Sequence, residues 1–215
     1  MSQDSIFDGV GSRLNHLLLT AGLRSLEPGA SQKFAEYLSL LQRWNARMNL
    51  TAIRDEHGIL TRHFVESIAC AEHLPVGVAS LLDFGSGAGF PGIPIALCHP
   101  EIAVTLAESQ AKKAAFLGEA VRTLNLNVVV FADRAEKLTR NYDCVCLRAV
   151  DRMERAVATA SDLVTGQGWV AVLTTETELV QLQRTAGSGF NWSAPIPLPG
   201  SEQRILARGK KISLS

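Results

Sequence analysis

Apolar side chains in the first 75 residues recur at spacings of three and four, a pattern that predicts helices. Pro28 stands where a helix can begin, and one apolar face follows it at Phe34, Leu38, Leu41 and Trp44. A second helical segment follows Asp55, a candidate N-cap, with apolar positions at Ile59, Phe64, Ile68 and Ala71. Residues 74–77 (Leu-Pro-Val-Gly) end the pattern. Residues 1–75 are therefore predicted to form a helical extension.

From residue 80 onward, short apolar runs alternate with helical segments. The runs span residues 80–84, 102–106, 128–131, 142–147 and 169–173, and helices are expected at 93–98, 112–124 and 153–164. Buried parallel strands read as continuous apolar runs, and strand–helix alternation is typical of a parallel sheet covered by helices. We therefore predict an α/β fold over residues 76–215: a mainly parallel sheet with helices on both faces, packed as one unit with the N-terminal extension.

The end of the chain follows a different pattern of residues. Residues 203–208 predict a last strand, and a hairpin of two late strands at the sheet edge fits this region. Pro195 and Pro197 weigh against the hairpin, because proline cannot donate to a strand ladder.

Charge and cysteine content narrow the function classes. The 215 residues hold 21 Lys and Arg against 21 Asp and Glu, so a polybasic nucleic-acid coat is disfavoured, although a local basic patch is not. The four cysteines (Cys70, Cys98, Cys144 and Cys146) include no C-x-x-C pair, which predicts reduced thiols and no metal site. The first eight residues carry acids and no basic segment, and no apolar run is long enough for a membrane span. We expect a cytoplasmic protein.

A glycine-rich turn follows the first predicted strand, at residues 85–92 (Gly-Ser-Gly-Ala-Gly-Phe-Pro-Gly). In a doubly wound sheet this is where a nucleotide-like ligand binds. Asp83, just before the turn, suits a cation, and Pro91 and Pro94 remove amide donors that a phosphate would need. The turn therefore favours a ligand with an ammonium group and no phosphate, such as S-adenosylmethionine.

Two other interpretations stay open. Gly87, Gly89 and Gly92 also match the dinucleotide pattern G-x-G-x-x-G, which would make the protein an NAD(P)-dependent oxidoreductase. A third class is an RNA-binding or assembly protein with no enzymatic activity.

Polar residues follow the later strands at the same sheet edge. Glu108 lies 23 residues after Gly85, close to the spacing of an acid that accepts hydrogen bonds from ribose hydroxyls. Residues 133–136 (Asp-Arg-Ala-Glu) follow the third strand, where they could hold an adenine edge or cap a helix. Arg148 follows the fourth strand and is expected to overhang the same crevice.

Three segments together resemble one family. They are residues 44–55 (Trp-Asn-Ala-Arg-Met-Asn-Leu-Thr-Ala-Ile-Arg-Asp), residues 62–67 (Arg-His-Phe-Val-Glu-Ser) and residues 83–94 around the glycine turn. The combination resembles the RsmG (GidB) family of bacterial 16S rRNA guanine-N7 methyltransferases. The resemblance implies a Rossmann-like class I methyltransferase fold, S-adenosyl-L-methionine as cofactor, and N7 of a guanine near the decoding centre as the target.

Carried over position by position, the resemblance places cofactor contacts at Gly85, Phe90, Ala135, Glu136 and Arg148, with Glu108 at the ribose. With the rest of the turn, the expected cofactor-binding set is Asp83, Gly85, Ser86, Gly87, Gly89, Phe90, Glu108, Ala135, Glu136 and Arg148.

This chain departs from the family pattern at three places. Phe90 stands where leucine is usual, and Glu66 replaces an aspartate. Thr174 and Thr175 follow Leu173 where the family commonly has Lys-Gly, so whatever that lysine binds must be left unbound here or be bound by another cation.

The expected substrate contacts are one histidine and cations near the family segments, after the fourth strand and in the acid-free tail: Arg47, Arg62, His63, Arg152 and Arg204. Arg152 could equally belong to a solvated helix face. His63 is more readily explained as a hydrogen-bonded structural residue than as a catalyst. Guanine N7 carries no proton, so the reaction needs no general base, and the sequence shows no catalytic triad. We expect a monomer that acts on 16S rRNA or the small ribosomal subunit, with no metal and no membrane partner.

Overall fold

The structure is a computed structural model that describes the backbone of residues 3–212 and the side chains of residues 9–212. Residues 213–215 of the acid-free tail and the first two residues of the acidic N-terminal segment lie outside the described residues. The strands are β1 (Ser80–Phe84), β2 (Ala103–Ala107), β3 (Val128–Phe131), β4 (Tyr142–Arg148), β5 (Val164–Thr175), β6 (Phe190–Trp192), β7 (Ile196–Pro197) and β8 (Arg204–Lys211). The α-helices are α1 (Gln3–Thr20), α2 (Pro28–Asn45), α3 (Glu56–Gly58), α4 (Glu66–Glu72), α5 (Gly92–Cys98), α6 (Ala111–Thr123), α7 (Met153–Leu163) and α8 (Glu176–Ala186). A π-helix (Ile59–Val65) and two 3₁₀ turns (Ala135–Lys137 and Gly187–Gly189) complete the described part of the chain.

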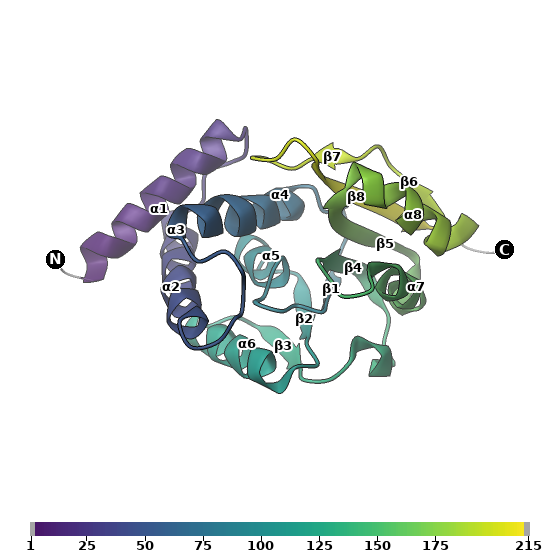
Figure 1. The fold of residues 1–215 in the computed structure, drawn as a ribbon, viewed down its shortest axis with the longest axis horizontal. Coiled ribbons are helices and arrows are strands. Elements are labelled where there is room, and N and C mark those ends of the chain that lie inside the picture. The colour runs from purple at the N-terminus through teal and green to yellow at the C-terminus, as the bar shows by residue number, and fades with distance from the viewer. Residues whose placement is uncertain (1–2, 213–215) are drawn as a thin grey trace.

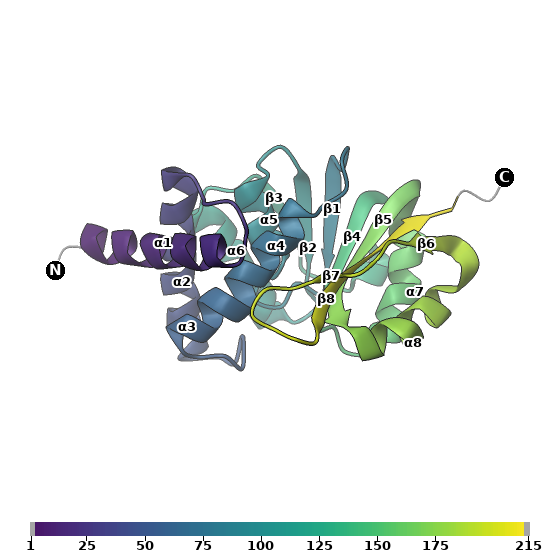
Figure 2. The ribbon, with the colours of Figure 1, turned by 90° about the horizontal axis from the view of Figure 1, so that it is seen from above.

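The strands form one sheet in the order β3-β2-β1-β4-β5-β8-β6, with β7 also paired to β8 (Figures 1 and 2). Strands β1 to β5 are parallel, and β8 runs antiparallel to β5, β6 and β7. The chain moves outward from β1 to β3 and then returns to place β4 on the other side of β1. The strand order therefore reverses beside β1, and ligands of open α/β sheets bind at the carboxyl ends of the strands at such a point.

Helices cover both faces of the sheet, as the alternation of strands and helices predicted. Leu81 of β1 belongs to the hydrophobic core formed with α1, α2, α4, α5 and α6, whereas its neighbour Leu82 belongs to the core formed with α7 and α8. Successive side chains of a strand point to opposite faces, so the parallel strands β1 to β5 contribute to both cores, and Ile205 and Ala207 of β8 form a third, small cluster with Leu179 of α8. Packing on both faces fixes the carboxyl ends of the strands, where the ligand-binding residues lie.

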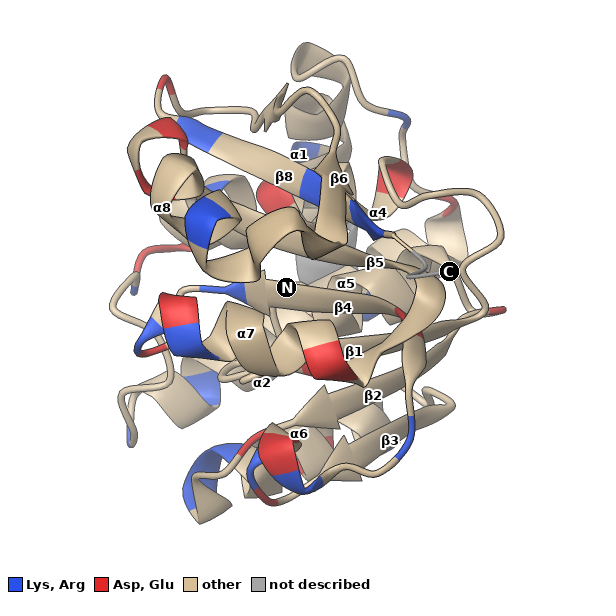
Figure 3. Ribbon diagram, turned by 90° about the vertical axis from the view of Figure 1, so that its right-hand side faces the viewer, with Lys and Arg blue, Asp and Glu red and all other residues tan. Residues whose placement is uncertain are grey.

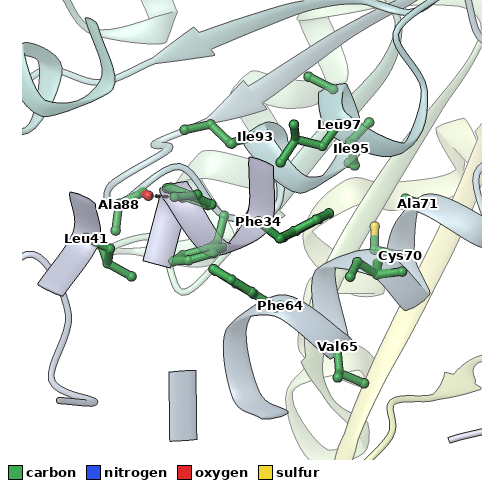
Figure 4. Packing of buried hydrophobic residues seen from close by; sticks show 14 of the residues in the cluster. Phe34, Leu41, Phe64, Val65, Cys70, Ala71, Ala88, Ile93, Ile95 and Leu97 are labelled. Atoms are coloured by element: carbon green, nitrogen blue, oxygen red, sulfur yellow. Dashed lines mark hydrogen bonds between the residues drawn. The ribbon is translucent and has the colours of Figure 1, made fainter. Parts of the chain in front are cut away.

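The N-terminal helices pack directly on the sheet domain. Pro28 occupies the first turn of α2, as predicted, and the buried face of that helix brings Phe34 and Tyr37 against Phe64 of the π-helix. Tyr37 also packs against Phe90 of the glycine turn, with ring centroids 5.4 Å apart. Figure 4 shows these helices sharing one core with α5 through Ile93, Ile95 and Leu97. The division into two units at residue 75 stays a prediction.

The helical segment after Asp55 differs from a regular α-helix. Asp55 accepts a hydrogen bond from the Gly58 amide at 2.7 Å and caps the segment, as predicted. Residues 59–65, however, form a π-helix. Ile59 and Phe64, both buried, are five residues apart, which is the spacing that brings side chains together in a π-helix. The wider turn places Arg62 and His63 of the same segment at the cavity described below.

The last part of the chain contains one helix that the pattern of apolar residues did not predict. Helix α8 begins after Thr175, whose hydroxyl accepts from the Glu178 amide while the Glu178 carboxylate accepts from the Thr175 amide. This reciprocal capping box has the sequence Thr-x-x-Glu, so the signal was present in the chain. The expected late strand is confirmed as β8, and its antiparallel pairing with β6 and β7 confirms the edge hairpin. Pro197 is tolerated because it lies in the two-residue strand β7.

Three smaller observations complete the fold. All four cysteines are free thiols, and three of them are buried, as expected. Strand β5 begins at Val164, five residues earlier than predicted, with a shift in its register against β4 between Tyr142 and Cys144. Between residues 3 and 212, no helix has the length and apolar character needed to cross a membrane.

Candidate functional site

A cavity of ≈ 620 Å³ opens at the carboxyl ends of β1, β2 and β4, beside the point where the strand order reverses. Its walls come from the glycine turn after β1, from the residues that follow β2, β3 and β4, from the loop at residues 50–53 and from the π-helix. Segments from the N-terminal extension and from the sheet domain therefore enclose the same space.

Four amide groups of the glycine turn are used within the chain. The Ser86 amide donates to the carbonyl of Ala107 at 2.9 Å, and the Gly87 amide donates to Oε2 of Glu108 at 2.9 Å. The Gly89 and Phe90 amides both donate to the Ser86 carbonyl. A pyrophosphate binds to free amides at such a turn. These four N–H groups already have acceptors within the chain, which favours a ligand without phosphate.

Two glycines fix the shape of the turn. Gly87 has φ +58°, and a Cβ there would meet only the Gly85 carbonyl oxygen at 3.9 Å, because the cavity lies in front of it. Gly89 has φ +91° on the opposite side of the turn, where a Cβ would lie 2.8 Å from the Tyr37 hydroxyl and 2.5 Å from Ile93. Glycine adopts positive φ without the steric penalty of a side chain. Gly87 therefore keeps the cavity open, and Gly89 lets the turn pack on the helices.

Glu108 lies at the end of β2 and lines the cavity. The residue is 6% exposed, and its carboxylate accepts from the amides of Gly87 and Gln110, at 2.9 and 2.7 Å. The remaining lone pairs can accept hydrogen bonds from a sugar. Its negative charge would repel a diphosphate at the same place. Ala135 and Glu136, in the 3₁₀ turn that follows β3, also line this side of the cavity.

Asp83 lies beneath the turn and not at the cavity wall. Its side chain is 1% exposed, Oδ2 accepts from the Gly92 amide at 3.1 Å, and Oδ1 has no hydrogen-bond partner among the described residues. Burial raises the pKa of this carboxyl from 3.8 to about 7, although the hydrogen bonds from Gly92 and Ser86 oppose the shift. Asp83 therefore supports the turn from below.

The raised pKa of Asp83 predicts a pH-dependent stability. The folded state holds the proton more tightly than the unfolded state, so this contribution to stability is complete below pH 3.8 and is lost as the pH rises to about 7. Asparagine keeps an acceptor for the Gly92 amide and cannot ionise. We expect the stability of D83N relative to the wild type to increase between pH 4 and 7, by roughly 4 kcal/mol at most. Urea unfolding at several pH values measures this difference, and a difference that does not change with pH would contradict the prediction.

On the other side of the cavity, one buried carboxylate binds three arginines. Glu66 is fully buried at the start of α4. Its Oε1 accepts from Nε of Arg62 at 3.1 Å, and its Oε2 accepts from Nη2 of Arg148 at 3.0 Å. The same Oε2 forms an ion pair with Nη2 of Arg204 at 3.0 Å. The cluster joins the N-terminal extension, the end of β4 and the start of β8. A group of one carboxylate and three guanidiniums keeps a net positive charge.

His63 is held in a neutral form beside this cluster. Its Nδ1 lies 3.0 Å from Nη2 of Arg148, and because a guanidinium only donates, Nδ1 accepts. Nε2 then carries the hydrogen and donates to Oγ1 of Thr51 at 2.7 Å. Burial, followed by the charges of the three arginines, lowers the pKa of His63 to about 3. The ring stacks on Phe90 with centroids 4.7 Å apart, so its role here is to hold the wall in place.

Sequence reasoning did not assign roles to two residues that shape the cavity. Asn45 at the end of α2 accepts from the amides of Leu50 and Thr51, at 2.9 and 3.1 Å, and so fixes the loop at residues 50–53. Tyr37 donates its hydroxyl hydrogen to the carbonyl of Ala88 and holds the glycine turn from below. Asn45 belongs to a segment that carried the family resemblance, but the pairing of its side chain could be found only in three dimensions.

The structure brings most of the expected site residues to the cavity. Those that line it are Gly85, Ser86, Gly87, Phe90, Glu108, Ala135, Glu136 and Arg148 from the expected cofactor set, and Arg62, His63, Arg152 and Arg204 from the expected substrate set. Asp83 and Gly89 lie behind the turn, and Arg47 is exposed in the turn after α2, outside the cavity lining.

The threonines that replace the usual Lys-Gly supply no cation. Oγ1 of Thr174 donates to Oε2 of Glu178 at 2.6 Å, and Thr175 caps α8. Arg204 pairs with Thr175 across the β5–β8 ladder and reaches the cavity from there.

Comparisons with known proteins agree with this architecture. Residues 30–189 match the model of the GidB family, described as rRNA small subunit methyltransferase G. A protein of that name from Roseiflexus sp. (strain RS-1) is 46% identical over 147 residues, which cover 64% of this chain and 62% of the relative, so the match spans about three fifths of the relative's length. A protein of the same name from Stenotrophomonas maltophilia (strain R551-3) is 40% identical over 167 residues, 76% of each chain.

Solved structures show the fold class. A SAM-dependent methyltransferase from Aquifex aeolicus superposes with a TM-score of 0.59 at 15% identity, over 74% of this chain and 95% of that one. A SAM-dependent O-methyltransferase from Thermotoga maritima gives a TM-score of 0.56 at 16% identity, over 80% and 71%. The α/β fold is therefore that of Rossmann-like class I methyltransferases. Because the family model matches most of its length, the chain belongs to the GidB family, rRNA small subunit methyltransferase G.

Proposed function

We propose that this chain is an S-adenosylmethionine-dependent methyltransferase that methylates N7 of a guanine in 16S rRNA, near the decoding centre. The observation that carries the proposal is the glycine turn. Its amides at Ser86, Gly87, Gly89 and Phe90 are used within the chain, and the Glu108 carboxylate lies against it, so the turn suits a nucleoside ligand without phosphate. Membership of the GidB family supports rRNA as the substrate class.

The residues present fit the cofactor. Glu108 would accept hydrogen bonds from the ribose hydroxyls, and Gly87 leaves room for the ligand above the turn, while Gly85 lines the cavity beside it. Ala135 and Glu136 would hold the adenine, and Phe90 and Arg148 would border the methionine part. When bound, S-adenosylmethionine supplies an electrophilic methyl group on a sulfonium.

The chemistry required of the chain is positioning. Guanine N7 offers a lone pair and carries no proton, so no residue has to act as a base. His63 agrees with this, because both of its ring nitrogens are engaged by Arg148 and Thr51 and its pKa of about 3 keeps it neutral. The cavity walls would hold the reacting groups in line, and such positioning supplies much of the rate in reactions of this kind.

The target base has to leave its helix to reach the cavity. N7 lies in the deep major groove of A-form RNA, where side chains cannot reach it, so the guanine must be in a loop or be turned out. As part of the proposal, the protein acts as a monomer in the cytoplasm, on 16S rRNA or the small ribosomal subunit.

Methyl transfer to small subunits from cells that lack this chain tests the function. We expect one guanine of 16S rRNA to gain a methyl group at N7, mapped by mass spectrometry, and calorimetry to detect binding of S-adenosylmethionine and not of NAD. Binding of NAD without S-adenosylmethionine would replace the proposal by an oxidoreductase. Binding of RNA with no methylation at any guanine would favour a non-enzymatic role.

A further inference from the structure

Charge is unevenly divided between the two sides of the cavity. The side that follows β2 and β3 has three acids (Glu108, Asp133 and Glu136) and two cations (Lys113 and Arg134). The side formed by the π-helix, the end of β4 and the start of β8 has five arginines (Arg62, Arg148, Arg152, Arg155 and Arg204) and one acid (Asp151). Over the ribbon seen in Figure 3, acidic and basic residues are interspersed, and the chain as a whole has no net charge. The basic half of the cavity is therefore a local feature.

Two of these arginines are fixed so that they face the cavity. Arg62 and Arg204 both bind the Glu66 carboxylate, at 3.1 and 3.0 Å, and their side chains are 41% and 21% exposed. Arg148 binds the same carboxylate but is only 7% exposed, because it lies deeper. Glu66 compensates one positive charge of the three. The nearby Glu178 carboxylate is engaged by the hydroxyl of Thr174 and the amide of Thr175.

The arrangement is that of an anion-binding clamp. Two like charges held close together repel each other, and an anion placed between them offsets that repulsion. Guanidinium groups present planar N–H donors that match the geometry of phosphate oxygens. The fixed orientation matters as well, because Glu66 holds both side chains before a ligand arrives and less conformational freedom is lost on binding.

We propose that Arg62 and Arg204 form a subsite for a backbone phosphate of the RNA substrate, the one next to the guanosine whose base enters the cavity. The inference rests on the proposed function and adds to it where the RNA backbone lies. Most residues proposed to hold the cofactor follow β1, β2 and β3, and Arg148 at the end of β4 borders it, whereas the clamp itself is formed by Arg62 of the π-helix and Arg204 of β8. The positive charge of the reaction moves from sulfur to the guanine ring, and a phosphate held here would stabilise the charged product in a basic environment.

RNA binding of R62Q, R204Q and the double variant tests the subsite. Fluorescence polarisation with a labelled 16S rRNA fragment that contains the decoding region, at several salt concentrations, gives both the affinity and its salt dependence. We expect each single variant to bind about tenfold more weakly, with the salt slope reduced by about one for each phosphate that the variant no longer binds. Affinity for S-adenosylmethionine, measured by calorimetry, should stay within about twofold of the wild type.

R184Q is the matched control, because Arg184 is exposed on α8 and does not line the cavity. It should leave RNA affinity and the salt slope unchanged. R204K keeps the positive charge of Arg204 but not the planar N–H donors of its guanidinium. Thermal unfolding of every variant identifies any loss of fold. Two results would overturn the subsite: unchanged RNA affinity and slope in the double variant, or an equal loss of S-adenosylmethionine binding, which would assign the clamp to the carboxylate of the cofactor. If the wild type binds the RNA fragment and loses affinity in the double variant but methylates no guanine, the proposed function is refuted while the phosphate subsite is supported.

Discussion

Replacement of Glu66 by glutamine is expected to lower the free energy of unfolding by about 3–5 kcal/mol, the usual cost of leaving buried charges without their partner. Glu66 is fully buried and is the carboxylate on which Arg62, Arg148 and Arg204 converge. Glutamine has nearly the same shape but no charge, so the three guanidiniums would repel one another. Arg148 would be affected most, because burial already lowers its pKa to about 10 and Glu66 is the main group that opposes this. Urea denaturation measures the change.

E72Q provides a comparison in the same helix. Glu72 also lies in α4, with a side chain that is 20% exposed; it accepts from the Arg24 amide at 2.9 Å and pairs with the Arg24 guanidinium, which is 81% exposed, at 3.6 Å. Glutamine keeps an acceptor for the amide, and an ion pair with an exposed partner contributes little, so we expect a change below about 1 kcal/mol. Equal effects of E66Q and E72Q would show that the arginine cluster does not depend on its carboxylate.

Replacement of Gly87 by alanine is expected to weaken binding of S-adenosylmethionine by about 100-fold, because the new methyl group would occupy the space in which the ligand is proposed to lie against the backbone. Gly87 has φ +58°, and no side chain lies within 4 Å of the position that a Cβ would take. The substitution also strains the backbone, by about 1–2 kcal/mol for a left-handed residue. Calorimetry gives the affinity, and thermal unfolding gives the stability.

G22A separates the two effects. Gly22, after α1, also has a positive φ (+74°) and open space at the Cβ position, but it is not at the cavity. It should lose a similar amount of stability and bind the cofactor normally. If G87A binds S-adenosylmethionine as tightly as G22A does, the ligand does not lie over the turn.

The two predictions concern the glycine turn and the arginine cluster, which both border one cavity, and the sequence predicted the turn better than the cluster. The glycine turn is a local feature: its residues are consecutive, and their spacing after an apolar run was enough to place a ligand there. Glu108 could be found in the same way, because it directly follows the next strand. Asp83 shows the limit of this reasoning, since neighbouring residues of a strand face opposite ways and the strand pattern did not say which side would be buried under the turn.

The arginine cluster was not predicted as a unit. Arg62, Arg148 and Arg204 were each named as candidates, but no sequence rule links residues separated by 86 and 56 positions through one carboxylate. Glu66 was noted only as a departure from the family pattern. Its burial requires the π-helix, α4, β4 and β8 to pack together, which is a property of the assembled core.

The sequence by itself determined the α/β class, the parallel core of the sheet, the late edge strands, and the glycine turn with Glu108 at the end of the next strand. These follow from short-range effects: the period of apolar residues, proline and capping preferences, and the small size of glycine. Only the tertiary structure decided that the N-terminal extension closes the cavity, that His63 is neutral, and that three distant arginines share Glu66. Those features depend on burial and on charges brought together from far along the chain, and desolvation and Coulomb energies exist only once the chain has folded.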